Sequence, residues 1–384
     1  MRILHVTPHL PPDQAANALL PWHLGNWATD RGDTIEYLSH PPRAGGGARL
    51  AGPATWLPRR SGGFFDRTLR LGSALGAYRI QRAFAPLLAR ADVVHVHSNG
   101  LLAEMAVLLA TRAKKPVVLT LYGTEIWHYE PKRGRPDLFT RAYHDATYVT
   151  FYSDRLMSRA FELGLRRRNA RVIYPPVGDE FSWHDEEHQA SERRSLGITN
   201  RHLLLNVKRL HPLAGQRFLI EAMMDVVHVH PDTRLVICGA GPLADDLKSA
   251  ARSAGVERHV DFAGLLDNFA ISRYCAAADL FVLPSLLEAL PTVAVEALAC
   301  GTPVLSSDNP GGLELNGVFG ADVSIVPREQ PIALGRAITH FLQHKRRTLT
   351  GTREAIEREF RPQAVAKEYW EVYREVSSSL ITDH

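Results

Sequence analysis

One pattern repeats along almost the whole chain: a short run of apolar residues, a helical period, and then another apolar run. In the first half these runs are "RILHVT", "TIEYLS", "DVVHVH", "PVVLTL", "ATYVTF" and "RVIY". The second half continues with "HLLLNV", "TRLVICG", "HVDFAG", "DLFVLP", "PVLSS" and "DVSIV". Strands that are apolar on both faces and joined by helical crossovers predict parallel sheets covered on both sides. The fold class is therefore α/β.

A polar, acidic break over residues 175–192 separates the two series of strands. The length of 384 residues also exceeds what one ordinary core requires. We therefore expect two Rossmann-like domains, 1–180 and 181–363, that face a cleft. The start of the chain shows no secretory signal pattern, and the most apolar stretch, 101–110, is too short to cross a membrane. Three widely spaced cysteines in apolar surroundings predict reduced core thiols of a cytoplasmic protein.

Charge is distributed unevenly between the halves. Residues 1–180 hold 24 Lys+Arg against 15 Asp+Glu, and the segment 51–115 alone holds ten against three. This basic segment mixes arginines with aromatic and aliphatic residues, as a helix that contacts anionic lipid or a phosphorylated acceptor would. A solvated helix face accounts for the same pattern, so both interpretations stay open. No nucleic-acid-binding motif accompanies the arginines, and we expect no nucleic-acid partner.

The segment "EALPTVAVEALACGTPVL", residues 288–305, places two carboxylates in an otherwise apolar run. Pro291 and Thr292 suit the first positions of a helix, which puts Glu288 in the preceding loop and Glu296 inside the helix. The first turn offers only one side chain able to cap several free backbone amides. Those amides are suited to an anionic ligand, at the edge where strands of a parallel sheet end.

A second charged group follows an earlier strand of the same predicted domain. Lys208 and Arg209 end the strand in "LLLNVKRL" just before a loop and a helix. A cation at this position faces the same edge of the sheet as the helix start near Pro291. Together the cation and the helix start could neutralise a diphosphate.

In this order and spacing, the segments resemble the GT-B glycosyltransferases of glycosyltransferase family 4, which retain the anomeric configuration of a nucleotide-diphosphate sugar. The resemblance covers most of the chain. It is carried by "MRILHVTPHLPP", "VVHVHS", "LYGTEIW", the Arg-Leu pair at 209–210, "GAGP", "FAGLL", the two glutamates with "ACGTPVLSSDNPG", and "EFRPQAVAKEYWEVYREV". It implies a GT-B fold in which the C-terminal helix, 364–384, crosses back to pack on the N-terminal domain.

The resemblance also implies a reaction and a site. A hexosyl group would move from a nucleotide-diphosphate sugar, the donor, to a glycan, glycolipid or small-molecule acceptor, without a cofactor. Arg209 would stabilise the diphosphate, Glu288 would bind donor sugar hydroxyls, and Glu296 would bind the ribose. The remaining donor-binding positions would be Lys208, Gly239, Gly241, Leu265, Leu290, Pro291, Thr292 and Val293. No D-x-D motif occurs, so the sequence implies no metal bound to the diphosphate.

Two departures from the family pattern concern these roles. Ala214 stands where relatives usually carry a lysine, and Lys208 stands where glycine is more usual, which suggests that Lys208 replaces the missing lysine. Tyr122 stands where many relatives carry histidine. On the acceptor side we expect His97, Tyr122 and Glu125. His95 and His97 share one strand face, where they either line the acceptor cleft or are satisfied core residues, and no third zinc ligand is evident in the sequence.

Three other functions stay open. Ala214 and Tyr122 are compatible with a non-catalytic partner subunit that binds sugar nucleotides, and a GT-B epimerase would use a similar donor site. The run "GAGPLA" at 239–244 fits a dinucleotide-binding fingerprint, although its proline alters the helix entry and the two glutamates would have no role. The presence of Arg209 together with Glu288 and Glu296 favours an enzyme over a non-catalytic subunit. We expect a cytoplasmic enzyme, with peripheral contact at the inner face of the membrane left open.

Overall fold

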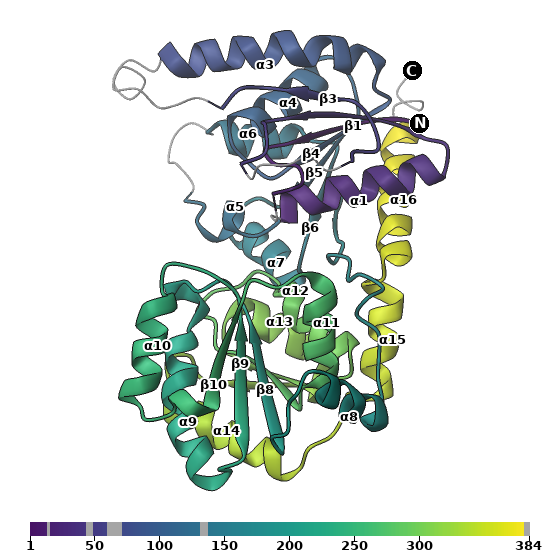
Figure 1. The fold of residues 1–384 in the computed structure, drawn as a ribbon. Coiled ribbons are helices and arrows are strands. Elements are labelled where there is room, and N and C mark those ends of the chain that lie inside the picture. Colours follow the sequence, from purple (N-terminus) through teal and green to yellow (C-terminus); the bar gives the residue numbers. More distant parts are fainter. Residues whose placement is uncertain (14–15, 44–48, 60–70, 131–136, 380–384) are drawn as a thin grey trace. The chain divides into compact units, whose positions relative to one another are not determined.

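The computed structural model describes residues 1–13, 16–43, 49–59, 71–130 and 137–379. The chain divides into two compact units (Figure 1). Unit 1 is Met1–Pro175 with Val365–His384, and unit 2 is Pro176–Ala364. The sequence placed these divisions at 180/181 and 363/364. Within the basic segment 51–115, residues 60–70 lie outside the described residues.

Unit 1 is built on a sheet of seven parallel strands in the described residues, with the order β3-β2-β1-β4-β5-β6-β7. The strands are β1 (Arg2–Thr7), β2 (Thr34–Ser39), β3 (Ala54–Trp56), β4 (Val93–His97), β5 (Val117–Leu121), β6 (Tyr148–Phe151) and β7 (Ala170–Val172). The helices are α1 (Ala16–Asp30), α3 (Leu71–Arg90), α4 (Leu101–Arg112), α5 (Thr124–Trp127), α6 (Leu138–Asp145), α7 (Asp154–Glu162) and α16 (Pro362–Ser379).

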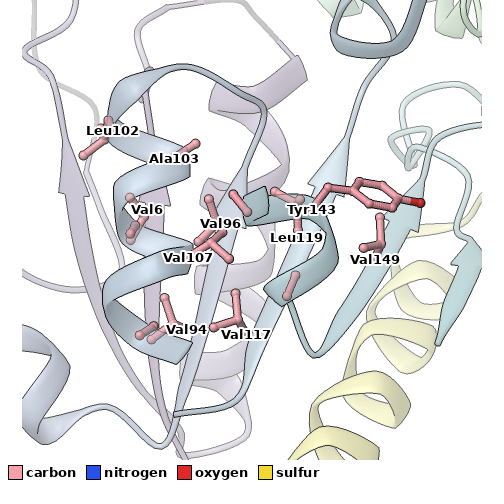
Figure 2. Close-up of a cluster of buried hydrophobic side chains, with 14 of the residues drawn as sticks. Val6, Val94, Val96, Leu102, Ala103, Val107, Val117, Leu119, Tyr143 and Val149 are labelled. Atoms are coloured by element: carbon pink, nitrogen blue, oxygen red, sulfur yellow. The ribbon is translucent and has the colours of Figure 1, made fainter. Parts of the chain in front are cut away.

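Alternate residues of the strands serve two different cores. Val94 and Val96 of β4 face α4, where they join Leu102 and Val107 in a cluster of buried hydrophobic side chains (Figure 2). The other face of the sheet packs against α1 and α16. There Ile3, Val93 and Val118 join residues of α16 that include Val365, Tyr369 and Tyr373. The last helix therefore returns to the first unit, as the fold prediction requires.

Unit 2 repeats the architecture with six parallel strands among the described residues, in the order β10-β9-β8-β11-β12-β13. The strands are β8 (His202–Val207), β9 (Thr233–Cys238), β10 (Val260–Gly264), β11 (Leu280–Leu283), β12 (Val304–Ser307) and β13 (Val323–Val326). The helices are α8 (Glu186–Ser195), α9 (Gln216–Val229), α10 (Ala244–Ser253), α11 (Asn268–Ala277), α12 (Thr292–Ala299), α13 (Pro310–Phe319), α14 (Pro331–Gln343) and α15 (Thr350–Glu359).

Helices cover both faces of the second sheet. The core on one face joins the strands to α9, α10 and α14, and α11, α12 and α13 lie against the other face (Figure 1). The predicted pair of Rossmann-like domains is thus confirmed. Cys238, Cys275 and Cys300 are all buried and free, as the sequence predicted for core thiols. None of the helices in the described residues is both long and apolar enough to cross a bilayer.

The strand order locates the candidate sites. In each sheet the direction of chain progression reverses between two neighbouring strands, which are β1 and β4 in unit 1 and β8 and β11 in unit 2. At such a reversal the connections leave on opposite faces of the sheet. Ligands of open parallel sheets bind there, beyond the carboxyl ends of the strands.

Candidate functional site

An ion pair joins the two strands that flank the reversal in unit 2. Lys208 follows β8, Glu288 lies in the loop after β11, and Lys208 Nζ is 2.6 Å from Glu288 Oε1. The side chains are 28% and 12% exposed, so the pair is partly shielded from water. The sequence placed each residue at this edge but did not predict that they pair.

Arg209 provides a second cation beside this pair. Its side chain is exposed, and its guanidinium makes no hydrogen bond or ion pair with any described residue. The backbone is held in place because Gln216 Nε2 donates to the carbonyls of Lys208 and Arg209, at 3.4 and 3.3 Å. An unpaired guanidinium on an anchored backbone is suited to bind an anion from solution.

The start of α13 fixes the loop that carries Glu288. Asn309 Nδ2 donates to the Ser285 carbonyl at 3.0 Å, and the Gly311 amide donates to the Glu288 carbonyl at 3.0 Å. A Cβ on Gly311 would lie 2.7 Å from the Cβ of Glu288, so only glycine permits this approach. The sequence analysis assigned no role to Asn309 or Gly311. Their signal was the "DNPG" run, in which Asn caps a helix that begins with Pro.

Helix α12 begins without a side-chain cap. Pro291 occupies the N-cap position, and no side chain accepts a hydrogen bond from the first turn. The sequence had placed Pro291 inside the helix, so the helix begins one residue later than expected, at Thr292. Leu290 is 9% exposed just before it. The amides of Thr292 and Val293 therefore remain to be satisfied by water or an anionic ligand.

Glu296 is a partly buried carboxyl within α12. It makes no hydrogen bond or ion pair with the described part of the chain. Burial raises its pKa to about 7, and the nearby carboxylate of Glu180 adds to the shift. Glu180 accepts a hydrogen bond from Asn268 Nδ2 at 3.1 Å. A shielded carboxyl that has no partner among the described residues, on a helix that follows a strand of a parallel sheet, is typical of a ligand-binding position. The sequence gave no indication of Glu180.

Gly239 and Gly241 let the loop after β9 approach the loop after β8. A Cβ on Gly239 would lie 2.1 Å from the Lys208 carbonyl oxygen, and one on Gly241 would lie 2.2 Å from that of Leu210. The two glycines thus shape the backbone that carries the cations. Leu265 follows β10 with its side chain 83% exposed.

Position 214, where relatives usually carry a lysine, is buried in this chain. Ala214 belongs to the 3₁₀ turn Pro212–Ala214 and is only 3% exposed. Gly215 follows in the left-handed region, with φ +67°, and a Cβ there would lie 2.0 Å from the Pro284 carbonyl oxygen.

In unit 1, three buried histidines lie on one face of β1 and β4. His5 Nδ1 is 3.0 Å from His97 Nε2, and His95 contacts Tyr373 Oη and Thr120 Oγ1 at 2.6 and 2.7 Å. All three rings are 0% exposed. Burial lowers the pKa of His5 to about 3 and those of His95 and His97 well below their usual range. The three imidazoles are therefore neutral near pH 7.

The acceptor-side residues expected from the sequence connect to this cluster. His97 Nδ1 lies 2.7 Å from Tyr122 Oη, and burial raises the pKa of Tyr122 well above its usual range, so the phenol stays protonated. Glu125 is 4% exposed and accepts from the amides of Tyr122 and Gly123 at 3.3 and 2.8 Å. The Glu125 carboxylate therefore holds the turn after β5.

The histidine cluster has the composition of a metal site. The sequence analysis saw no third ligand near His95 and His97, but β1 brings His5 beside them, with one ligand atom of each residue within 4.8 Å of the others. Five of the six ring nitrogens already have hydrogen-bond partners, and His5 Nε2 alone has none in the described residues. The contacts therefore fit a hydrogen-bonded chain of neutral rings.

Models of known protein families match residues in both units. The Glycosyltransferase Family 4 model matches residues 22–181, and the Glycosyl transferases group 1 model matches residues 188–359. The chain belongs to glycosyltransferase family 4. Among curated proteins similar to this chain, a putative teichuronic acid biosynthesis glycosyltransferase, TuaC of Bacillus subtilis, is 28% identical over 71% of this chain and 65% of its own length.

A second relative is the GDP-mannose-dependent alpha-(1-6)-phosphatidylinositol monomannoside mannosyltransferase of Mycolicibacterium smegmatis. It is 33% identical over 58% of this chain and 62% of its own length. The matched region thus spans just under two thirds of these relatives. Solved structures agree in fold: Anabaena HepE in complex with UDP has a TM-score of 0.75 at 18% identity, covering 98% of this chain and 100% of its own. The predicted GT-B fold is confirmed.

Proposed function

We propose that the protein transfers a hexosyl group from a nucleotide-diphosphate sugar to a hydroxyl group of a glycan, glycolipid or small-molecule acceptor. The observation that carries this proposal is the arrangement at the carboxyl edge of the second sheet. There a shielded Lys208–Glu288 ion pair and the exposed Arg209 accompany helix α12, whose start has no side-chain cap and which contains Glu296. Neither Arg209 nor Glu296 makes a hydrogen bond or ion pair with any residue that the structure describes. This set combines binding groups for an anion with binding groups for hydroxyls.

Each group has a role that follows from its chemistry. Arg209 binds the diphosphate and stabilises the charge that develops as it leaves, together with the amides at the start of α12. Glu288 accepts hydrogen bonds from hydroxyls of the donor sugar, and Lys208 holds one of its oxygens in place. Glu296 accepts hydrogen bonds from the ribose. Gly239 and Gly241 keep the loops close enough for a nucleotide to lie beside Leu265.

We also propose that the anomeric configuration is retained. The family resemblance implies front-face transfer assisted by the donor phosphate. Breaking the glycosyl bond produces an oxocarbenium-like carbon, which a nearby carboxylate stabilises electrostatically. The test is the anomeric configuration of the product by proton NMR, and an inverted product would refute retention.

Metal independence is a further part of the proposal. Arg209 and the amides at the start of α12 supply positive charge for the diphosphate, and the sequence contains no D-x-D motif that would hold a divalent cation there. Turnover should therefore survive dialysis against a chelator, with no recovery needed from added magnesium or manganese. Loss of activity that either metal restores would refute this part.

The experiment that tests the function is a panel of nucleotide sugars. UDP-, GDP- and ADP-hexoses are scored for thermal stabilisation of the protein and for release of the nucleoside diphosphate, with and without octyl α-D-glucopyranoside or octyl α-D-mannopyranoside as acceptor. Stabilisation by one donor with acceptor-stimulated release is the expected result. Absence of both, across the panel, would refute a transferase.

A non-catalytic subunit that binds sugar nucleotides is the second candidate, because the buried Ala214 removes one cation that relatives carry. The same panel separates the two functions. A subunit of this kind would be stabilised by a nucleotide sugar and would release no nucleoside diphosphate. Turnover without any acceptor, accompanied by epimerisation of the sugar, would instead identify an epimerase.

We propose further that the enzyme acts in the cytoplasm and contacts the inner face of the membrane through segment 51–115. Helix α3 exposes Leu75 and Tyr78, at 47% and 58%, beside the exposed Arg79 and Arg82. Flotation with anionic liposomes should retain the protein at low salt and lose it at high salt. A double variant, Arg79→Glu with Arg82→Glu, should bind more weakly, and no binding of the wild type at low salt would refute the contact.

A further inference from the structure

An arginine from a distant part of the chain contacts the loop that carries Glu288, which is residues 284–291 between β11 and α12. Arg328 lies just after β13, and its Nη1 donates to the Leu286 carbonyl at 3.2 Å. Leu286 comes two residues before Glu288. The guanidinium of Arg328 therefore acts on the backbone that leads to the carboxylate proposed to bind the donor sugar.

Asp308 holds this guanidinium in place. Arg328 Nε donates to Asp308 Oδ1 at 2.8 Å, and the Arg328 amide donates to the same oxygen at 3.0 Å. The two side chains are 44% and 41% exposed, and an ion pair this exposed contributes little to the stability of a fold. What the pair supplies is direction, because the carboxylate orients a planar donor that also reaches the Leu286 carbonyl.

The order of strands in the sheet brings these groups together. β11, β12 and β13 are neighbours, and the register aligns Ser307 and Val326, the last residues of β12 and β13. Arg328 can therefore reach past the turn after β12 to the loop after β11. On the opposite side, the Leu286 amide donates to the Leu213 carbonyl, in the segment after β8, at 2.8 Å. Leu286 is thus held from both sides.

The other anchors of the loop are buried. The Ser285 carbonyl accepts from the buried Asn309, and the Glu288 carbonyl accepts from the amide of the buried Gly311. Between these two points, the Leu286 carbonyl is held by a side chain that is 44% exposed. Truncating a side chain this exposed leaves the core and the buried anchors unchanged, while the middle of the loop gains freedom.

We propose that Arg328, oriented by Asp308, is a positioning residue that keeps the Glu288 carboxylate directed at the hydroxyls of the donor sugar. The inference rests on the proposed role of Glu288 in donor binding. Lys208 holds the carboxylate itself from the side of β8, and Arg328 holds the loop backbone from the side of β13. A hydrogen bond to a sugar hydroxyl weakens steeply when its angle changes, so a looser loop binds the sugar less tightly.

This role predicts an effect on the sugar but not on the nucleotide, because Arg209 and Glu296 lie outside the loop. Arg328→Ala should lower the affinity for a nucleotide sugar by about three- to tenfold, as one weakened hydrogen bond does, and should leave the affinity for its nucleoside diphosphate within about twofold. Calorimetry with the donor found in the panel measures both. Arg217→Ala removes an exposed arginine that pairs with Glu221 on α9, and this matched control should change neither affinity.

A double-mutant cycle tests whether Arg328 acts through Glu288. If it does, Arg328→Ala should cost no further affinity for the nucleotide sugar in a Glu288→Gln background. Independent contributions would instead multiply, and multiplied losses would overturn the proposal. Equal losses of affinity for the nucleotide sugar and for the nucleoside diphosphate would also overturn it, since they would indicate a general structural role.

Hydrogen exchange, measured by mass spectrometry on the unbound protein, tests the loop without a ligand. Arg328→Ala should speed the exchange of amides in 285–290 and leave those of β11 unchanged, whereas Arg217→Ala should alter neither. Unchanged exchange in 285–290 would contradict the positioning role.

The outcomes separate this inference from the function on which it rests. A wild-type protein that neither binds nor turns over any nucleotide sugar refutes the transferase itself. A donor whose affinity is insensitive to Glu288→Gln refutes the role of Glu288. A donor site that responds to Glu288→Gln and is indifferent to Arg328→Ala refutes only the positioning role of Arg328.

Discussion

Donor affinity should rise with pH across neutrality because of Glu296. Burial and the Glu180 carboxylate raise the pKa of Glu296 to about 7 in the unbound protein. About one tenth of the molecules then carry the ionised carboxylate at pH 6 and about nine tenths at pH 8, as a single titration with this pKa requires. If ribose hydroxyls bind only the ionised form, the apparent association constant increases about tenfold over this range.

The same group makes the stability of the unbound protein depend on pH in the opposite direction. The pKa of Glu296 is above its ordinary value of 4.5, so the protonated carboxyl favours the folded state. This contribution is complete below the ordinary pKa and is lost as the pH rises through about 7. A bound donor supplies hydroxyl groups to the ionised form. The increase in melting temperature on donor binding should therefore be larger at pH 8 than at pH 6.

Calorimetry with the nucleotide sugar that stabilises the protein most in the panel measures this effect. A nucleotide sugar is preferred to a free nucleoside diphosphate, whose terminal phosphate titrates near the same pH. Glu296→Gln should bind weakly with no pH dependence. Glu180→Gln is the matched variant, and by removing the like charge it should move the midpoint below pH 7. A flat wild-type profile, or an unchanged slope in Glu296→Gln, would refute the assignment of Glu296 to the ribose.

Arg209→Ala should lower turnover by about 10² to 10³-fold, because the leaving diphosphate loses a charged donor, and near-normal steady-state kinetics would remove Arg209 from the site. Lys208→Ala should weaken donor binding about tenfold or more, and the exposed Lys248→Ala should not. Equal donor affinities of these two variants by calorimetry would contradict the role of Lys208. Gly241→Ala should lower the melting temperature by at least about 2 °C, because its Cβ would lie 2.2 Å from the Leu210 carbonyl oxygen. An unchanged melting temperature would show that the loops after β8 and β9 can move apart without a loss of stability.

The two sheets could be predicted because most of their strands can be recognised from their own residues, without knowledge of the neighbouring strands. The run "VVHVH" in β4 and the run "HLLLNV" in β8 are buried at every residue. Strands buried on both faces belong inside a parallel sheet, and the intervening helical periods supply the crossovers. Three-residue strands such as β3 (Ala54–Trp56) carry too few residues for a recognisable pattern, and the chain itself does not state the order of strands in the sheet.

Only those features of the site that depend on residues close together in the sequence could be predicted. Placing Glu288 in a loop and Glu296 in the helix that follows needed only the Pro-Thr pair and the strand before it. The ion pair between Lys208 and Glu288 joins residues far apart in the chain, and it depends on β8 and β11 being neighbours. His5 beside His97, and Arg328 beside Leu286, depend on strand order and register in the same way.

The Lys208–Glu288 pair also explains how the site tolerates Ala214. The 3₁₀ turn that contains Ala214 packs against the segment that follows β11. The Leu286 amide donates to the Leu213 carbonyl at 2.8 Å, and a Cβ on Gly215 would lie 2.0 Å from the Pro284 carbonyl oxygen. A long cation at 214 would have to leave this buried position to reach the strand edge. Lys208 starts at the edge already, and its ammonium is held by the carboxylate proposed to bind the donor sugar. With the proposed roles of these two residues, the binding of the sugar and of the diphosphate would be linked through one ion pair. Glu288→Gln should then weaken donor binding partly by releasing Lys208.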